Sequence, residues 1–140
     1  MHFRSLTPEF AVTSQISLGD LPAIAAAGYR AIVCNRPDQE SAGQPPFAAI
    51  KAEAAKLGLD AVYIPIAGLR IGAEQSAAFD AAFDRLPKPI LAYCRSGNRS
   101  TGLWSVSQSS RKPVAAATAG EQRQASGILG AMRRFVQGGG

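Results

Sequence analysis

Residues 90–104, "ILAYCRSGNRSTGLW", decide how the rest of the sequence is interpreted. An apolar run ends at Cys94, and a short polar loop that contains Arg95 and Arg99 separates it from a predicted helix. When a loop leaves a buried strand and begins a helix, its backbone N–H groups and the helix N-terminus together form a cradle for an anion. The segment therefore predicts an anion-binding loop, residues 95–99, with a cysteine at its base.

A cysteine in this position is predicted to act as a nucleophile. The helix dipole and the arginines favour the Cys94 thiolate, which is the reactive form of the side chain. Arg99 is predicted to clamp a bound oxyanion through two hydrogen bonds. The predicted anion-binding residues are Arg95, Ser96, Gly97, Asn98 and Ser100, of which Ser100 would cap the helix or donate a hydrogen bond to the sulfur. The alternative is a buried cysteine before an ordinary turn, and the density of Gly, Ser and Arg residues argues against it.

The rest of the chain alternates between predicted strands and predicted helices. Apolar, β-branched runs predict strands over 10–15, 29–35, 61–66 and 89–94. Helical spacing and glycine stops predict helices over 18–27, 47–58, 74–86 and 100–109. This order predicts a single α/β domain with a mostly parallel, four- to five-stranded sheet flanked by helices. Ligands of such sheets bind at the carboxyl ends of the strands, where Cys34 and Cys94 both fall.

Composition and charge narrow the function classes. The formal net charge is +5, yet residues 1–110 carry ten basic and nine acidic side chains, so the excess lies in residues 111–140. A basic terminal segment without a binding motif argues against a nucleic-acid partner. No apolar run is long enough to cross a bilayer, and no secretory signal precedes the domain, which predicts a cytoplasmic protein without a membrane partner. Residues 111–140 are expected to form a partly helical segment with a frayed end.

The second cysteine and the single histidine are predicted to have no catalytic role. Cys34 stands in "IVCNRPD", which has no glycine and no clear following helix, so it is interpreted as a structural cysteine. Two separate cysteines in this setting favour reduced thiols over a disulfide. His2 stands near the N-terminus and is the only histidine, which argues against a histidine-based metal site, and no cofactor is expected.

Several segments together resemble one known family. They are "RSLTPEFAVTSQIS", "GYRAIVCNRPDQE", "GQPPFAAI", "YIPIAGLRI" and "ILAYCRSGNRSTGLW". The loop "CRSGNRS" resembles the active-site loop of rhodanese-type sulfurtransferases and of the related cysteine phosphatases. Taken jointly, the segments resemble the phosphatase-like domain of beta-lactamase-hydrolase-like proteins, over about residues 3–108. The resemblance implies a fold like that of the dual-specificity phosphatases and, as a partner, a persulfide dioxygenase on a separate chain.

The resemblance leaves two chemistries open, and the loop length bears on the choice. Cysteine phosphatases of this kind use Cys-X5-Arg, whereas four residues separate Cys94 from Arg99 here. A shorter ring is narrower and suits the single extra sulfur of a persulfide better than a phosphoryl group. Phosphate ester hydrolysis also needs a general acid, and the loop "AGLRIGAE" lacks an aspartate. Asp38 is a candidate general acid, although a turn-forming role is the favoured interpretation of this residue.

These observations predict a cysteine-dependent sulfurtransferase. The Cys94 thiolate would take sulfur from a small anionic donor such as thiosulfate or a low-molecular-weight persulfide. Arg99 and the amides of 95–99 would hold the donor, while Arg95 would steer it. The first alternative is a cysteine phosphatase that acts on a phosphoester through a thiophosphate intermediate. The second alternative is a non-catalytic domain that binds an anion or a partner, because a shared scaffold does not fix function.

Overall fold

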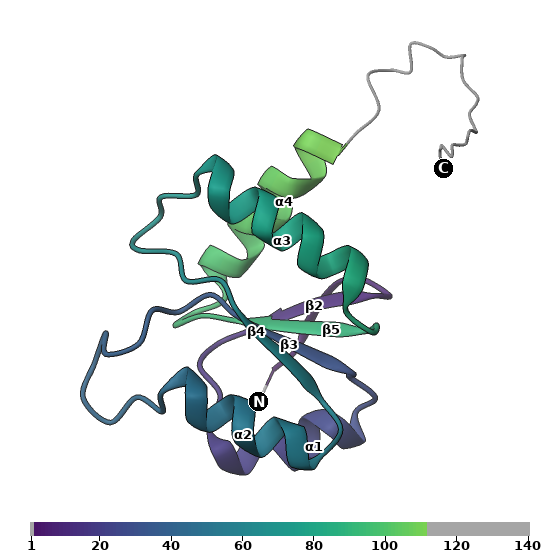
Figure 1. Cartoon of the computed structure of the whole chain (residues 1–140), viewed down its shortest axis with the longest axis vertical. Coiled ribbons are helices and arrows are strands. Elements are labelled where there is room, and N and C mark those ends of the chain that lie inside the picture. The colour runs from purple at the N-terminus through teal and green to yellow at the C-terminus, as the bar shows by residue number, and fades with distance from the viewer. Residues whose placement is uncertain (1, 112–140) are drawn as a thin grey trace. The chain divides into compact units, whose positions relative to one another are not determined.

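The computed structural model describes residues 2–111, which form a five-stranded sheet covered by helices on both faces (Figure 1). The strand order is β1-β2-β5-β3-β4. The strands are β1 (Arg4–Thr7), β2 (Phe10–Thr13), β3 (Ala31–Cys34), β4 (Asp60–Tyr63) and β5 (Ile90–Tyr93). Strands β2, β5, β3 and β4 run parallel, and β1 joins the edge antiparallel to β2. The predicted mostly parallel α/β sheet is confirmed.

Among the described residues, three α-helices connect strands and a fourth follows the last strand. After a short 3-10 turn (Leu18–Asp20), they are α1 (Leu21–Ala26), α2 (Phe47–Lys56), α3 (Ala73–Arg85) and α4 (Asn98–Arg111). Helices α1 and α2 cover one face of the sheet, and α3 and α4 cover the other (Figure 1). Within residues 2–111 no helix is long and apolar enough to span a membrane.

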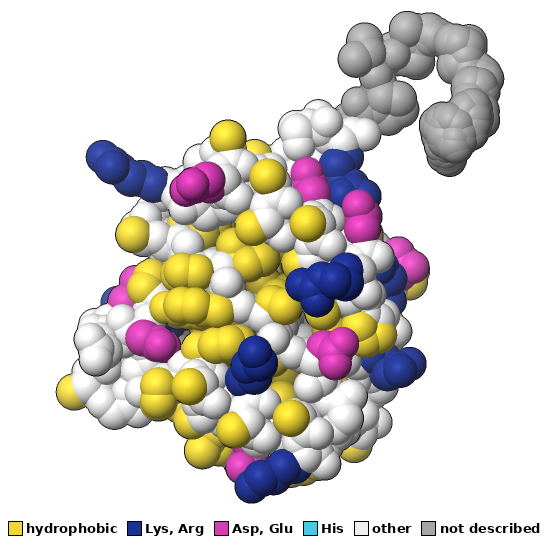
Figure 2. Space-filling model, in the orientation of Figure 1, with side chains coloured by type: hydrophobic (Ala, Val, Ile, Leu, Met, Phe, Trp, Pro, Cys, Tyr) yellow, Lys and Arg dark blue, Asp and Glu magenta, His cyan; other side chains and the backbone are white. Residues whose placement is uncertain are grey.

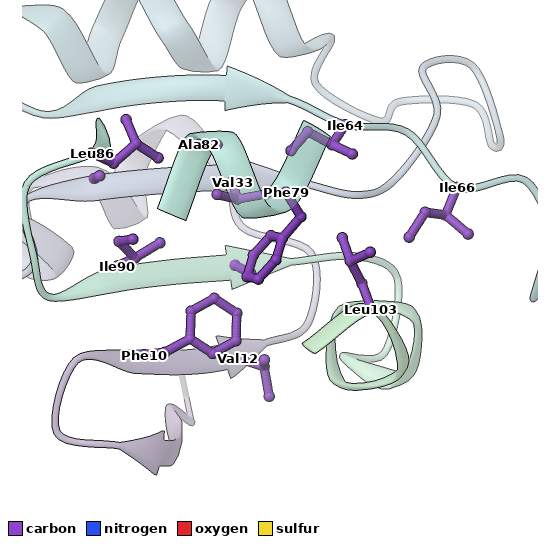
Figure 3. Close-up of a cluster of buried hydrophobic side chains, with 12 residues drawn as sticks. Phe10, Val12, Val33, Ile64, Ile66, Phe79, Ala82, Leu86, Ile90 and Leu103 are labelled. Atoms are coloured by element: carbon purple, nitrogen blue, oxygen red, sulfur yellow. The ribbon is translucent and has the colours of Figure 1, made fainter. Parts of the chain in front are cut away.

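The sheet separates two hydrophobic cores because side chains alternate along each strand. On β5, Ile90 and Ala92 pack toward α3 and α4 with Phe79 and Leu103 (Figure 3). Leu91 and Tyr93 pack toward α1 and α2. All four residues of β5 are buried, as expected for a central strand of a sheet covered on both faces. This burial fixes the position at which the chain leaves β5 and enters the loop after Cys94.

The structure differs from the sequence prediction at several places. The strand expected over 61–66 begins at Asp60 and ends three residues early, at Tyr63. Strand β1 was not predicted, because its residues are polar and partly exposed and its ladder to β2 is irregular. The helix expected over 100–109 begins two residues earlier, at Asn98, so Arg99 and Ser100 lie in its first turn. The helix expected over 18–27 begins as a 3-10 turn, in which the Asp20 carboxylate accepts the Ser17 N–H at 2.9 Å. The prediction for residues 111–140 lies outside the described residues, apart from Arg111 at the end of α4.

Candidate active site

The loop after β5 closes around the sulfur of Cys94. Cys94 is fully buried, and the Gly97 N–H donates to its Sγ at 3.0 Å. Gly97 has a φ of +95°, and a Cβ there would approach the Thr13 carbonyl oxygen to 3.5 Å. Because this conformation is costly for other residues, glycine is what lets the loop turn back over the sulfur. Cys94 thus lies at the base of this loop, and the binding of an anion by the loop stays a prediction.

Backbone N–H groups stabilise the Cys94 thiolate. Burial by itself raises the pKa of this thiol, because it disfavours the charged form. Hydrogen bonds from the backbone N–H groups of Ser100, Ser96, Arg99 and Gly97 act in the opposite direction and prevail, so the pKa of Cys94 lies below its ordinary value. These donors come from the loop and from the first turn of α4, where the orphan amides of a helix point outward along its axis. The thiolate is therefore favoured by local backbone geometry.

Arg99 is held in place by a carboxylate that the sequence prediction missed. Its Nη1 and Nη2 donate to the two carboxylate oxygens of Glu40 at 2.7 and 2.8 Å, and Nη1 also donates to the Ile66 carbonyl oxygen at 2.8 Å. A planar pair of this kind fixes the orientation of the guanidinium. Hydrogen bonding to Glu40 is the main reason that the pKa of Arg99 is raised, and the Cys94 sulfur contributes in the same direction. Arg99 therefore faces Glu40 on one edge and Cys94 on another.

A second arginine, Arg36, shares this carboxylate. It follows β3, is only 5% exposed, and donates from Nε to Glu40 Oε1 at 3.0 Å. Its other nitrogens donate to Gln15 Oε1 and Ser41 Oγ, both at 3.0 Å. The hydrogen bond from Arg99, followed by that from Arg36, lowers the pKa of Glu40 to about 2 despite partial burial. The sequence "NRPDQE" shows that Arg36 and Glu40 follow a predicted strand. It does not show that Glu40 lies beside Arg99, because that contact depends on the folded sheet.

Ser100 takes a role other than the two predicted for its side chain. Its hydroxyl donates to Asn35 Oδ1 at 2.8 Å, and the Asn35 amide donates to the Ile64 carbonyl oxygen at 2.8 Å. A hydroxyl has one proton to donate, so the Ser100 side chain does not also donate to the sulfur. Only its backbone N–H acts on Cys94. The prediction of a side-chain hydrogen bond to sulfur is therefore wrong, and Ser100 ties α4 to the carboxyl ends of β3 and β4.

The remaining loop residues lie at the rim. The side chains of Arg95, Ser96 and Asn98 belong to exposed residues, whereas Gly97 is buried. Ser96 Oγ accepts the Asn98 N–H at 3.4 Å, at the point where α4 begins. The Arg95 carbonyl oxygen accepts the Gln15 N–H at 3.4 Å, which joins the loop to the end of β2. Arg95 is thus placed to meet an anion from solvent, and its predicted steering role stays a prediction.

Asp38, the candidate general acid, is engaged in a structural role. Its carboxylate accepts the N–H of Phe47, the first residue of α2, at 2.9 Å. The Asp38 N–H donates to the Tyr63 hydroxyl, also at 2.9 Å. A carboxylate at a helix N-terminus satisfies an orphan amide and complements the dipole. This matches the turn-forming role that the sequence favoured for Asp38.

Cys34 lies on the neighbouring strand in a different setting. Its Sγ donates to the Arg36 carbonyl oxygen at 3.3 Å, so the sulfur keeps its proton. Burial raises the pKa of the Cys34 thiol. Its side chain belongs to the core beneath α1 and α2. Among the described residues, no cluster of three or more His, Cys, Asp or Glu side chains is arranged to hold a metal ion.

Comparison with known proteins places the chain in a family. Residues 2–111 match the family model described as "Beta-lactamase hydrolase-like protein, phosphatase-like domain". The chain belongs to this family. It is 31% identical over 93 residues to a beta-lactamase hydrolase-like protein of Agrobacterium fabrum, covering 66% of this chain and 22% of that protein. It is 30% identical over 108 residues to one of Xylella fastidiosa, covering 77% and 25%. The chain thus spans about a quarter of the length of these relatives.

Solved structures show the same fold. A protein of Neisseria meningitidis, named a "putative phosphatase", is 31% identical with a TM-score of 0.70, over 79% of this chain and 80% of that one. A protein of Shewanella putrefaciens with the same name is 22% identical with a TM-score of 0.67, over 89% and 82%. The protein Tk-PTP in its active form is 18% identical with a TM-score of 0.58, over 78% and 74%, a likeness of fold alone. These comparisons support an enzyme of the phosphatase-like family and fit the phosphatase alternative better than the predicted sulfurtransferase, which they do not support.

Proposed function

We propose that this domain is a cysteine-dependent phosphatase for small phosphate esters or anhydrides that have a weakly basic leaving group. The observation that carries the proposal is the thiolate of Cys94, held by backbone N–H groups beside an arginine that Glu40 orients. Membership of the phosphatase-like family supports the same choice.

The reaction begins with attack of the Cys94 thiolate on phosphorus. A sulfur–phosphorus bond forms, the bond to the leaving oxygen breaks, and the electron pair leaves with that oxygen. Water then attacks the thiophosphate, which returns the thiolate and releases inorganic phosphate. The N–H groups of the loop and the edge of Arg99 that faces Cys94 would bind the equatorial oxygens, where negative charge is spread in the transition state.

The restriction to weakly basic leaving groups follows from the two carboxylates of the 36–46 loop, Glu40 and Asp38, because neither is placed to protonate the leaving oxygen. Glu40 is paired with two arginines and has a pKa of about 2, so it carries no proton to donate near neutral pH. Asp38 accepts the N–H at the start of α2. With neither positioned as a general acid, an alkoxide would leave poorly, whereas a phenolate or a phosphate group would leave readily.

The test compares two substrates of different leaving-group basicity. p-Nitrophenyl phosphate should be hydrolysed, and glycerol phosphate should be hydrolysed far more slowly, with inorganic phosphate measured in both cases. The Cys94→Ser variant is the control and should be inactive on both. Equal rates on the two substrates would contradict the leaving-group limit, and absence of hydrolysis with either substrate would contradict the phosphatase proposal.

A second candidate, sulfur transfer, is favoured by the size of the loop. Four residues separate Cys94 from Arg99, and the Gly97 N–H already contacts the sulfur at 3.0 Å. A ring this tight fits a persulfide sulfur well. The Cys94 thiolate would attack the outer sulfur of thiosulfate, sulfite would leave with the electron pair of the broken S–S bond, and cyanide or a thiol would then take the sulfur.

Intact-mass measurement separates the two candidates. After incubation with thiosulfate, a gain of one sulfur atom that is absent in Cys94→Ser would support sulfur transfer. Hydrolysis of p-nitrophenyl phosphate without such a gain would support the phosphatase. A folded protein inactive in both assays would favour the third alternative, a domain that binds an anion or a partner.

A further inference from the structure

Strand β4 forms an open edge of the sheet. Within residues 2–111 the sheet order ends at β4, which pairs with β3 on one side only. The N–H groups of Asp60 and Ile64 donate to Arg30 and Cys34, next to and within β3, at 3.2 and 2.9 Å. Since backbone groups alternate in direction along a strand, Ala61 and Tyr63 direct theirs away from β3. Such an edge is ready to pair with another strand.

An apolar band follows this edge. Figure 2 shows hydrophobic side chains gathered across the middle of this face, over β4 and between α3 and α2, with charged side chains around them. Two hollows lie along the band. One, of about 370 Å³, is lined by Tyr63, Ile64, Pro65, Glu74, Gln75 and Ala78. The other, of about 220 Å³, includes Ala61, Val62 and Leu59 in its lining. The band is therefore continuous from one end of β4 to the other.

The two ends of the band carry opposite charge. Helix α3 runs back along β4, so exposed Glu74, in its first turn, lies at the Tyr63 end, where both line one hollow. Exposed Arg85, in the last turn of α3, lies at the Asp60 end. There Arg85 and Lys51 outnumber the Asp60 carboxylate in the lining of the other hollow, so this end keeps a positive excess. A second molecule that approaches in the opposite direction would bring its Arg85 to Glu74 and its Glu74 to Arg85. The edge is thus complementary to itself.

We propose that β4 is a homodimer interface in which two copies pair their β4 strands antiparallel and extend the sheet from one protomer into the other. The outward-facing residues fix the register: Ala61 lies opposite Tyr63 of the second copy, and Val62 faces its own counterpart across the twofold axis. The same register brings α3 of each copy beside the other, with both Glu74–Arg85 pairs formed. Pro65 stands at the next outward position and has no N–H, so the ladder ends there.

The test is the mass of the full chain in solution, measured by light scattering during size exclusion over a concentration series reaching about 1 mM, the range of a weak complex. The wild type should show twice the mass of one chain. Glu74→Arg and Arg85→Glu should each raise the dissociation constant about tenfold or more, because every pair occurs twice in a symmetric dimer. The double variant Glu74→Arg/Arg85→Glu should restore the dimer.

Two features of this design keep the result specific. Both substitutions oppose the dipole of α3, so loss of helix stability would make the double variant the weakest dimer rather than a restored one. The matched control is Glu9→Arg, which makes the same charge change at an exposed position between β1 and β2, at the other end of the sheet order. It should leave the dimer intact. A monomeric wild type, a double variant that stays monomeric, or loss of the dimer in Glu9→Arg would each overturn the proposal.

Discussion

Two cysteines lie at the carboxyl ends of neighbouring parallel strands, Cys34 as the last residue of β3 and Cys94 directly after β5, and their thiols behave in opposite ways. The register pairs Cys34 of β3 with Tyr93 of β5, so Cys94 lies one residue beyond. Cys94 receives N–H groups from the loop that follows it, and its pKa falls, whereas Cys34 donates to a carbonyl oxygen, and burial raises its pKa. Position at the carboxyl end of a strand does not make a cysteine reactive. The segment that follows it does.

The difference lies in glycine and in the helix. After Cys94 the chain turns at Gly97, with a φ of +95°, and enters α4 at Asn98, so several amides converge on the sulfur. After Cys34 comes Asn35-Arg36-Pro37, whose side chains serve other partners: Asn35 holds Ser100, and Arg36 holds Glu40. Cys34 therefore packs in the hydrophobic core beneath α1 and α2, while the residues after it hold side chains of the site around Cys94.

The largest expected effect separates the two cysteines directly. Cys94→Ser should lower turnover of p-nitrophenyl phosphate by about a thousandfold or more, because it removes the nucleophile. Cys34→Ala should keep turnover within about threefold of wild type and lower the free energy of unfolding by about 1 kcal/mol, the cost of a small cavity. Steady-state kinetics and urea unfolding measure both effects. A Cys34→Ala variant as inactive as Cys94→Ser would break the comparison.

Arg99→Lys should have the next largest effect. Lysine keeps the positive charge but lacks the planar guanidinium. It therefore cannot pair with both oxygens of Glu40 while it also binds a phosphoryl group, and kcat/KM should fall about a hundredfold. Arg36→Lys is the matched variant, since Arg36 shares Glu40 but extends from the loop after β3. It should lower kcat/KM less than Arg99→Lys does. Equal losses in the two variants would show that Arg99 acts only through Glu40.

Gly97→Ala tests whether the turn creates the reactive thiol. Alanine at a φ of +95° is strained by about 1–2 kcal/mol, although its Cβ would make only an ordinary contact, at 3.5 Å, with the Thr13 carbonyl oxygen. The loop should relax away from the sulfur, so kcat/KM should fall about thirtyfold at most and the pKa of Cys94 should rise toward its ordinary value. The alkylation rate of Cys94 as a function of pH measures the shift. Gly58→Ala is the control for stability alone, because Gly58 also has a positive φ, of +76°, and a Cβ there would meet nothing within 4 Å.

Among the substitutions expected to impair catalysis, Glu40→Gln should have the smallest effect, a loss of about tenfold, because glutamine still meets Arg99 but without charge. Its clearer signature is stability against pH. Glu40 has a folded pKa of about 2 against an ordinary value of 4.5, so its stabilisation is complete above the ordinary value and disappears as pH falls toward 2. Urea unfolding should show a loss in this window for wild type that is smaller in Glu40→Gln. Identical pH dependence in both proteins would argue against the Glu40–arginine cluster.

Local pattern was sufficient for most of the fold and for the cradle. The strands that became β2, β3, β4 and β5 are apolar and β-branched, and the loop after Cys94 carries its glycine and arginines in one short segment. Strand β1 was not predicted, because it is polar and lies at an edge of the sheet. Its residues are only partly buried or exposed, so its sequence lacks the apolar alternation that marks a strand. The role of Glu40 was not predicted, because it depends on a contact to Arg99, 59 residues away in sequence. Only the pairing of β3 with β5 brings these two residues together.

The central claim is that the segment after Cys94, and not its place at a strand end, creates the reactive thiolate. The most direct measurement is the alkylation rate of each cysteine in the folded protein as a function of pH, with iodoacetamide as reagent and the modified peptides quantified by mass spectrometry. The account predicts that Cys94 reacts with a midpoint below the ordinary thiol value of 9.0 and that Cys34 titrates above it. Coincident titration of the two cysteines, or a lower midpoint for Cys34, would contradict it.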